Sequence, residues 1–84
     1  MYLQIGQNTV VREDSVVGIF DIDNTTSSHI TRKFLNSAEK AGNLINIAED
    51  IPKSFIVCTR GDGYTVYLSQ LSTATLNKRA QTVL

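Results

Sequence analysis

The chain has 84 residues, of which 42% are apolar and 19% are charged, and its formal net charge is zero. This length and composition are typical of one small globular domain, here residues 1–84, and exclude a disordered chain. The zero net charge excludes nucleic-acid binders whose whole surface is basic. The core is small and has few aromatic residues, so we expect oligomerisation to supply further buried surface.

Charge distribution and cysteine content give further indications. Residues 1–52 carry seven acidic and four basic side chains, whereas residues 53–84 carry one acidic and four basic side chains. The single cysteine, Cys58, lies in an apolar run, which favours a buried side chain over a reactive thiol or a metal ligand. The sequence shows no signal peptide and no apolar run near 18 residues, so we expect a cytoplasmic protein without membrane contact.

The first part of the chain predicts three strands. Short β-prone runs at residues 2–5 and 9–11 are separated by turn residues. Val16–Phe20 is a nearly continuous apolar run, which indicates a strand buried on both faces, or one whose second face is covered by a partner chain. Gly18 in the middle of this run indicates a β-bulge or the close approach of another backbone.

An amphipathic helix is predicted next. Its apolar face has helical spacing and consists of Ile30, Phe34, Leu35, Ala38 and Ala41. A hydroxyl side chain from Thr26, Ser27 or Ser28 would cap its start. Lys40 suits the negative end of the helix dipole, and Gly42-Asn43 supplies a left-handed stop.

The second half predicts a hairpin between further strands. Residues 44–47 form a short strand, and residues 55–59 and 64–69 have strong β propensity. Arg60–Gly63 joins the last two with residues typical of a tight turn.

A second helix is predicted from the cap Ser72 to about residue 82. Leu71 and Leu76 have the spacing of a hydrophobic staple. Leu76, Ala80 and Val83 form a narrow apolar stripe, which could dock on its own sheet or on a neighbouring subunit. The order of elements predicts an α+β fold with a small, mainly antiparallel sheet, one central helix and one C-terminal helix.

Residues Asp21–Thr25 raise the question of an enzyme. A strand followed by Asp-x-Asp-x-Thr resembles the nucleophile loop of haloacid-dehalogenase-type phosphatases, but the later Lys and carboxylates that balance phosphate and hold magnesium are missing. We therefore interpret Asp21 and Asp23 as turn and capping residues. The sequence predicts no catalytic residue, metal, cofactor or small-molecule substrate.

Several stretches together resemble a known family. Tyr2–Gly6 and Val16–Asp21 look like the start of the small bacterial extracellular-matrix regulators, the Rem family, and Pro52–Val57 matches a strand opening. Tyr67–Ser72 followed by Thr75–Ala80 resembles the C-terminal helix of that family. The similarity covers almost the whole chain and is closest to the RemB branch.

This resemblance implies a non-enzymatic, cytoplasmic transcriptional regulator of extracellular-matrix and biofilm genes. The RemA branch looks like a DNA-binding protein that forms rings and engages DNA through arginines, so the implied partners are further copies of the chain, DNA and a sister Rem-type regulator. Binding would use phosphates with little base readout. A homo-oligomer would multiply weak phosphate contacts.

Two sets of candidate residues follow. The candidates for DNA binding are Arg12, Lys53, Lys78 and Arg79. The candidates for an oligomer interface or core are Gly18, Phe20, Leu76 and Ala80. Where the RemA branch has basic residues before two strands, this chain has Asp14-Ser15 and Asp50-Ile51, and carboxylates repel phosphate. A protein–protein interaction module that does not touch DNA therefore stays open as an alternative.

Overall fold

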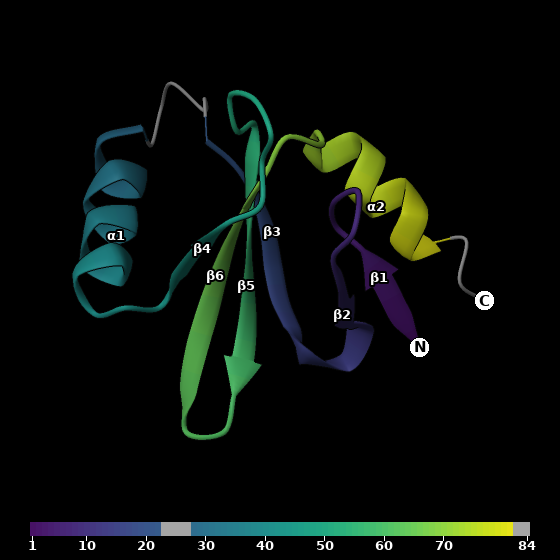
Figure 1. The fold of residues 1–84 in the computed structure, drawn as a ribbon, viewed down its shortest axis with the longest axis horizontal. Coiled ribbons are helices and arrows are strands. Elements are labelled where there is room, and N and C mark those ends of the chain that lie inside the picture. The colour runs from purple at the N-terminus through teal and green to yellow at the C-terminus, as the bar shows by residue number, and fades with distance from the viewer. Residues whose placement is uncertain (23–27, 82–84) are drawn as a thin grey trace.

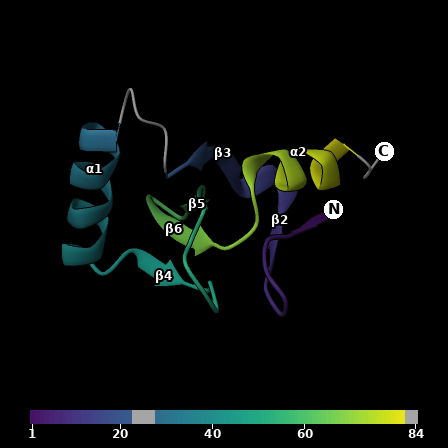
Figure 2. The same ribbon diagram turned by 90° about the horizontal axis from the view of Figure 1, so that it is seen from above.

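A computed structural model describes residues 1–22 and 28–81, with the backbone alone for Ser28 and Gln81. The chain forms three layers (Figures 1 and 2). A four-stranded sheet lies in the middle, helix α1 covers one face, and helix α2 with a two-stranded sheet covers the other. The predicted α+β class with a mainly antiparallel sheet is confirmed.

The bounds of the elements agree with the predicted ones to within about a residue at most ends, the usual scatter of such assignments. The strands are β1 Tyr2–Gln4, β2 Val10–Arg12, β3 Val16–Asp21, β4 Leu44–Asn46, β5 Ser54–Arg60 and β6 Gly63–Ser69. The helices are α1 Ser28–Lys40 and α2 Thr73–Gln81, and a short 3-10 helix, η1, spans Glu13–Ser15.

The strand order of the central sheet is β3-β5-β6-β4. The predicted β5–β6 hairpin is confirmed, with Arg60 opposite Gly63. Gly61 has a φ of +58° at the first central position of the turn, which is typical of a type II′ turn and favours glycine. Strand β4 pairs parallel to β6, because α1 carries the chain across the sheet before β4 begins.

Strand β3 is an edge strand of this sheet. Val16 and Ile19 pack against the core on the α2 side. On the α1 side, Val17 is 65% exposed and Phe20 is 46% exposed. The strand is therefore not buried on both faces within one chain, and the second alternative, a face covered by a partner chain, stays a prediction.

Helix α1 places the middle of its predicted apolar face on the central sheet, whereas Ile30 and Ala41 at the two ends of that face are exposed. Ala38 is fully buried, and Phe34 and Leu35 pack beside it against the sheet. At the C-terminus, Gly42 has a φ of +78°, and the Asn43 N–H donates to the Ala38 carbonyl at 2.9 Å. This is the predicted left-handed stop, in the form of a Schellman motif. The side chains predicted to cap the start of α1 lie outside the described side chains.

Helix α2 docks on its own chain, which decides a question that the sequence left open. The Thr75 N–H donates to the Ser72 hydroxyl at 3.1 Å, so Ser72 is the predicted N-cap. Leu71 and Leu76 belong to the same apolar cluster, as a hydrophobic staple requires. This cluster also contains residues of β1, β2 and β5, so Leu76 and Ala80 of the stripe are covered within the chain. The third residue of the stripe, Val83, lies outside the described residues.

Two buried serines join the layers. The Ser69 hydroxyl of β6 donates to the Ile5 carbonyl at 2.6 Å and accepts from the Leu71 N–H at 3.1 Å. The Ser54 hydroxyl of β5 donates to the Leu71 carbonyl at 2.7 Å. Both side chains are fully buried, so these bonds satisfy groups that water cannot reach.

Candidate nucleic-acid and assembly surfaces

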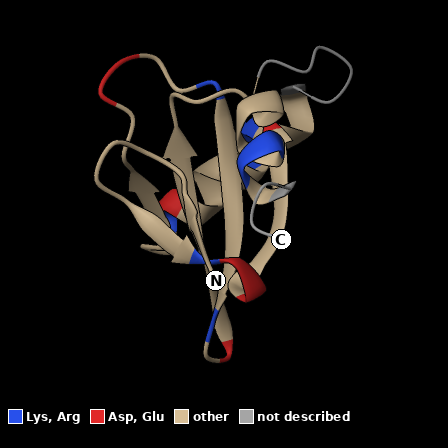
Figure 3. Ribbon diagram, turned by 90° about the vertical axis from the view of Figure 1, so that its right-hand side faces the viewer, with Lys and Arg blue, Asp and Glu red and all other residues tan. Residues whose placement is uncertain are grey.

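The four predicted DNA-binding residues lie on separate elements. Arg12 ends β2 and Lys53 directly precedes β5. The other two, Lys78 and Arg79, lie in the last turn of α2. In Figure 3, basic positions are spread from the top of the molecule, over α2, to the β5–β6 turn, with acidic segments between them. One chain therefore does not gather these residues into one compact patch.

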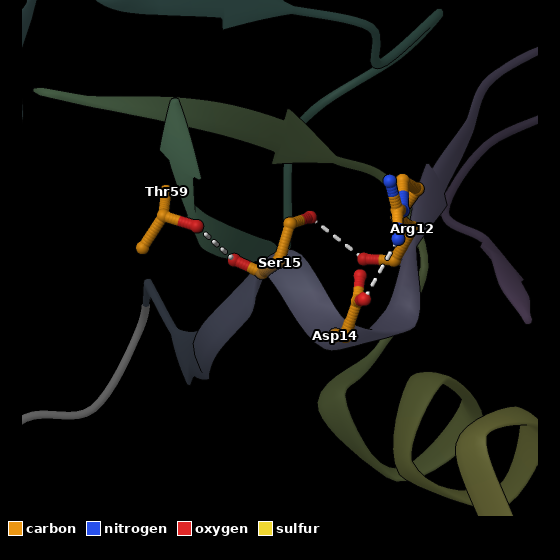
Figure 4. A network of polar contacts seen from close by, with 4 residues as sticks. All are labelled: Arg12, Asp14, Ser15 and Thr59. Carbon is orange, nitrogen blue, oxygen red and sulfur yellow. Dashed lines mark hydrogen bonds and ion pairs between the residues drawn. The ribbon is translucent and has the colours of Figure 1, made fainter. Parts of the chain in front are cut away.

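Arg12 has a local acidic partner. Its guanidinium lies 2.9 Å from the Asp14 carboxylate, and both side chains are 70% exposed. The Ser15 hydroxyl donates to the Arg12 carbonyl at 2.6 Å, and the Thr59 hydroxyl donates to the Ser15 carbonyl at 3.4 Å (Figure 4). An exposed ion pair of this kind contributes about 0–1 kcal/mol, so a phosphate can compete with Asp14 for the guanidinium.

Arg12 and Lys53 flank opposite ends of the β3–β5 pair. The chain runs from Arg12 through η1 to Val16 at one end of β3, and Lys53 directly precedes Ser54, which pairs with Asp21 at the other end. Five strand steps correspond to about 17 Å, which exceeds the Debye length of about 8 Å at physiological salt. The two charges therefore act as separate sites on one chain.

Lys78 and Arg79 are neighbours at the C-terminal end of α2. Lys78 is exposed, whereas Arg79 is half-buried and donates to the Gln4 carbonyl of β1 at 3.2 Å. Arg79 thus stabilises the packing of α2 on the two-stranded sheet, and it also contributes a positive charge. Its replacement would change the packing as well as the charge of the surface.

Arg60 is a basic residue that was not among the predicted site residues. It lines a pocket of about 240 Å³ together with Arg12, Ser15 and Thr59. The two arginines are 48 positions apart in sequence and lie on different sheets. In the sequence, Arg60 was recognisable only as the first residue of a predicted tight turn. The packing of β2 beside β5 is what brings it close to Arg12.

An apolar groove of about 320 Å³ lies between α1 and the β3 edge of the sheet. All of its lining residues are uncharged, and they are Val17, Phe20, Ile30, Thr31, Phe34, Phe55 and Val57. Val17 and Ile30 are 65% and 71% exposed. Large apolar side chains that are exposed together are typical of an interaction surface.

Gly18 influences this groove through Phe20, which lines it. The β3–β5 register shifts between Val16 and Gly18, which is the predicted β-bulge. A Cβ atom on Gly18 would lie 2.5 Å from the Phe20 ring, so the glycine leaves room for that ring. The ring stacks on Phe55 with a centroid separation of 5.1 Å. Gly18 and Phe20 are thus one packing unit at the sheet edge.

Comparison with known proteins covers nearly the whole chain. Residues 2–80 match the model of the RemA-like family, described as extracellular matrix regulatory protein A-like. The chain belongs to the RemA-like family. It is also 35% identical to extracellular matrix regulatory protein B of Bacillus subtilis (strain 168) over 81 residues, which cover 96% of this chain and 91% of that protein. The predicted resemblance to this family and to its B-type member is confirmed.

Two acidic residues of this RemA-like chain stand where the RemA branch has basic ones, and both lie on its surface. Asp14 and Asp50 are exposed, and Asp14 pairs with Arg12.

Among the described residues, no helix has the length and apolar character needed to cross a bilayer.

The assembly candidates fall into two groups in this RemA-like chain. Leu76 is fully buried in the chain's own core, and Ala80 packs against the same cluster. Phe20 instead lines the groove, where it is partly exposed, and Gly18 leaves room for its ring.

Asp21 has a different environment from the one expected of a residue that caps its own turn. Asp21 accepts a hydrogen bond from the Thr73 hydroxyl at 3.0 Å, at the first residue of α2 and 52 positions away. Asp23 lies outside the described residues. The described carboxylate therefore contacts the C-terminal helix, a role that local turn chemistry did not predict.

Proposed function

We propose that this chain is a non-enzymatic, cytoplasmic regulator of extracellular-matrix and biofilm genes that self-associates and binds DNA through phosphate contacts. The observation that carries the proposal is the family match over residues 2–80, together with the similarity to extracellular matrix regulatory protein B. Neither the family name nor the name of that relative states a role in transcription or contact with DNA, so both belong to the proposal.

The surface supports phosphate contacts made by several copies together. Arg12, Lys53 and Lys78 are exposed but separated on one chain, so each would meet a different phosphate. Such contacts are individually weak, and a homo-oligomer multiplies them by raising the effective concentration of each site. Their energy comes largely from counterion release, which makes the affinity depend steeply on salt.

The test is fluorescence anisotropy with a labelled duplex of about 30 base pairs, titrated at several salt concentrations. We expect wild-type protein to bind with a steep salt dependence. The triple variant Lys53→Ala, Lys78→Ala, Arg79→Ala should bind more weakly and reduce the slope of log affinity against log salt by up to about three, about one for each lost phosphate contact. Because Arg79 also bonds to the Gln4 carbonyl, this holds for a variant whose circular dichroism spectrum is that of wild type.

A matched control separates specific contacts from total charge. Arg32→Ala, Lys33→Ala, Lys40→Ala removes the same three charges from the exposed positions of α1. This variant should keep most of the affinity. If both triple variants lose affinity equally, the binding reports net charge alone, and if folded wild-type protein does not bind at low salt, direct DNA recognition is wrong.

One observation favours a second candidate function, a module that binds a protein partner and not DNA. The exposed charge of Arg12 is offset by Asp14, and basic and acidic segments alternate along the ribbon in Figure 3. In that case the chain should bind a purified sister Rem-type regulator in calorimetry while showing no anisotropy change with duplex. The same protein preparation should be used for both measurements.

A further inference from the structure

The open edge of β3 lies beside the apolar groove, and this combination distinguishes it from the rest of the surface. Within the described residues, no strand pairs with β3 on the side away from β5. Strand β3 contains no proline, and its one charged residue, Asp21, lies on the α2 face of the sheet, where it accepts from the Thr73 hydroxyl at 3.0 Å. Charges and prolines are the features by which sheet edges are usually protected. The bulge between Val16 and Gly18 also protects the edge locally, and it leaves the segment from Gly18 onward regular.

The hydrogen-bond pattern tells which backbone groups of β3 point outward. The Ile22 N–H donates to the Lys53 carbonyl at 3.1 Å, toward β5. Because antiparallel pairs alternate, Phe20 also exchanges its bonds with β5, whereas Ile19 and Asp21 direct theirs to the open edge. Two residues on one edge therefore offer a donor and an acceptor each.

We propose that β3 pairs antiparallel with β3 of a second copy of this chain across a two-fold axis. The pairing joins the two central sheets and closes both grooves. In this arrangement Phe20 lies opposite its counterpart, and Ile19 exchanges backbone hydrogen bonds with Asp21 of the second copy. The inference rests on the self-association in the proposed function and names the surface that mediates it.

A second copy fits because the edge is complementary to itself. An antiparallel pair across a two-fold axis matches the donors and acceptors of one edge with the same groups of the other. Residues that lie opposite each other in such a pair project from the same face of the sheet. Each groove would therefore meet the apolar groove of the other copy, with no charged lining residue to repel it.

The other open edge of the sheet, β4, fits the groove less well. Its Leu44 side chain is already packed under α1, and its exposed apolar residue, Ile45, lines a different pocket with Arg60 and Tyr64. The α1 surface beside it carries the exposed residues Glu39 and Lys40. A neighbour's β4 would thus bring polar and charged groups to an apolar groove.

The test compares two valine substitutions in the full chain. Val17→Lys places a charge in the groove, and Val10→Lys places the same charge on β2, where Val10 is 58% exposed. We expect wild type and Val10→Lys to sediment with at least twice the mass of the chain at about 100 µM, a concentration that suits a weak dimer. Val17→Lys should lower that mass at least twofold, with an unchanged circular dichroism spectrum.

A cross-link tests the symmetry of the contact. In a Cys58→Ala background, Phe20→Cys should form an intermolecular disulfide with oxidised glutathione, because opposed residues without mutual hydrogen bonds lie about 4.5 Å apart at Cα. Val10→Cys in the same background should remain largely uncross-linked. A monomeric wild type, an unchanged mass for Val17→Lys, or an associated Phe20→Cys protein that does not cross-link would overturn the proposal.

The failure of this proposal can be distinguished from that of the proposed function. If DNA binding and self-association persist in Val17→Lys, the regulator stands and its interface lies elsewhere. If wild type associates through β3 but folded protein binds no duplex at low salt, the interface stands and the DNA-binding function is wrong. Retention of a second, unrelated protein by wild type and not by Val17→Lys, with wild type monomeric, would assign the groove to another partner.

Discussion

Ser69 joins three segments through a single buried hydroxyl. It donates to the Ile5 carbonyl and accepts from the Leu71 N–H, whereas the equally buried Ser54 makes one such bond, to the Leu71 carbonyl. Ser69→Ala leaves a buried carbonyl without a donor and should cost about 1–3 kcal/mol of unfolding free energy. Ser54→Ala should cost less, and urea denaturation that ranks the two variants in the reverse order would contradict this account.

The Cys58 thiol should make the unfolding free energy depend on pH in the alkaline range. Burial raises the pKa of the Cys58 thiol, while a hydrogen bond with Ser15 lowers it, and the net direction is upward. The thiol therefore ionises more readily in the unfolded chain, with a pKa of about 8.5. Stability from this group is present below that value and is lost as pH rises through the pKa of the folded state.

The measurement is the unfolding free energy at several pH values from about 7 to 10, the range that spans the thiol pKa. Wild type should lose more stability over this range than Cys58→Ala, although the variant starts lower because it leaves a small cavity. Equal slopes would show that the thiol does not contribute. The comparison removes contributions to the pH dependence that the two proteins share.

At the scale of an element, α2 depends on one residue of its apolar stripe. Leu76 is fully buried, and Asn77 beside it is exposed. Leu76→Asp would bury a charge with no partner at that position, which should unfold the chain or lower its melting temperature steeply. Asn77→Asp adds the same charge to the surface and should change stability by less than about 0.5 kcal/mol. Thermal unfolding by circular dichroism compares the two.

The end of α1 depends on its backbone conformation. Gly42 has a φ of +78° and open space around its Cα, whereas Gly63 lacks a left-handed φ and has an ordinary van der Waals distance to Arg60. Gly42→Ala should therefore cost about 1 kcal/mol through backbone strain alone. Gly63→Ala should be close to neutral. Chemical denaturation of both variants tests whether the Schellman motif contributes to stability.

At the scale of the whole molecule, self-association should make stability depend on concentration. Binding that is restricted to the folded state stabilises it by mass action. For a dimer of this size, a hundredfold increase in concentration should raise the melting temperature of wild type by about 5 °C or more. The melting temperature of Val17→Lys should stay constant over the same range. A concentration-independent wild type would contradict association of folded chains.

The amino-acid sequence by itself determined the elements and their ends. The Ser72 cap, the Leu71–Leu76 staple and the Gly42 stop involve residues within about one helical turn, and the β5–β6 hairpin depends on a short turn. Such features depend on local backbone preferences and side-chain spacing, which a single sequence displays directly. The family resemblance likewise follows from the order and spacing of residues along the chain.

Only the tertiary structure decided the surfaces. It placed β3 at an edge, so that a run which indicated burial on both faces carries an exposed apolar side. It also set Arg12 beside the pocket of Arg60 and Asp21 against Thr73. These neighbours are about fifty positions apart in the chain. Their proximity results from strand order and layer packing, which local propensity does not encode.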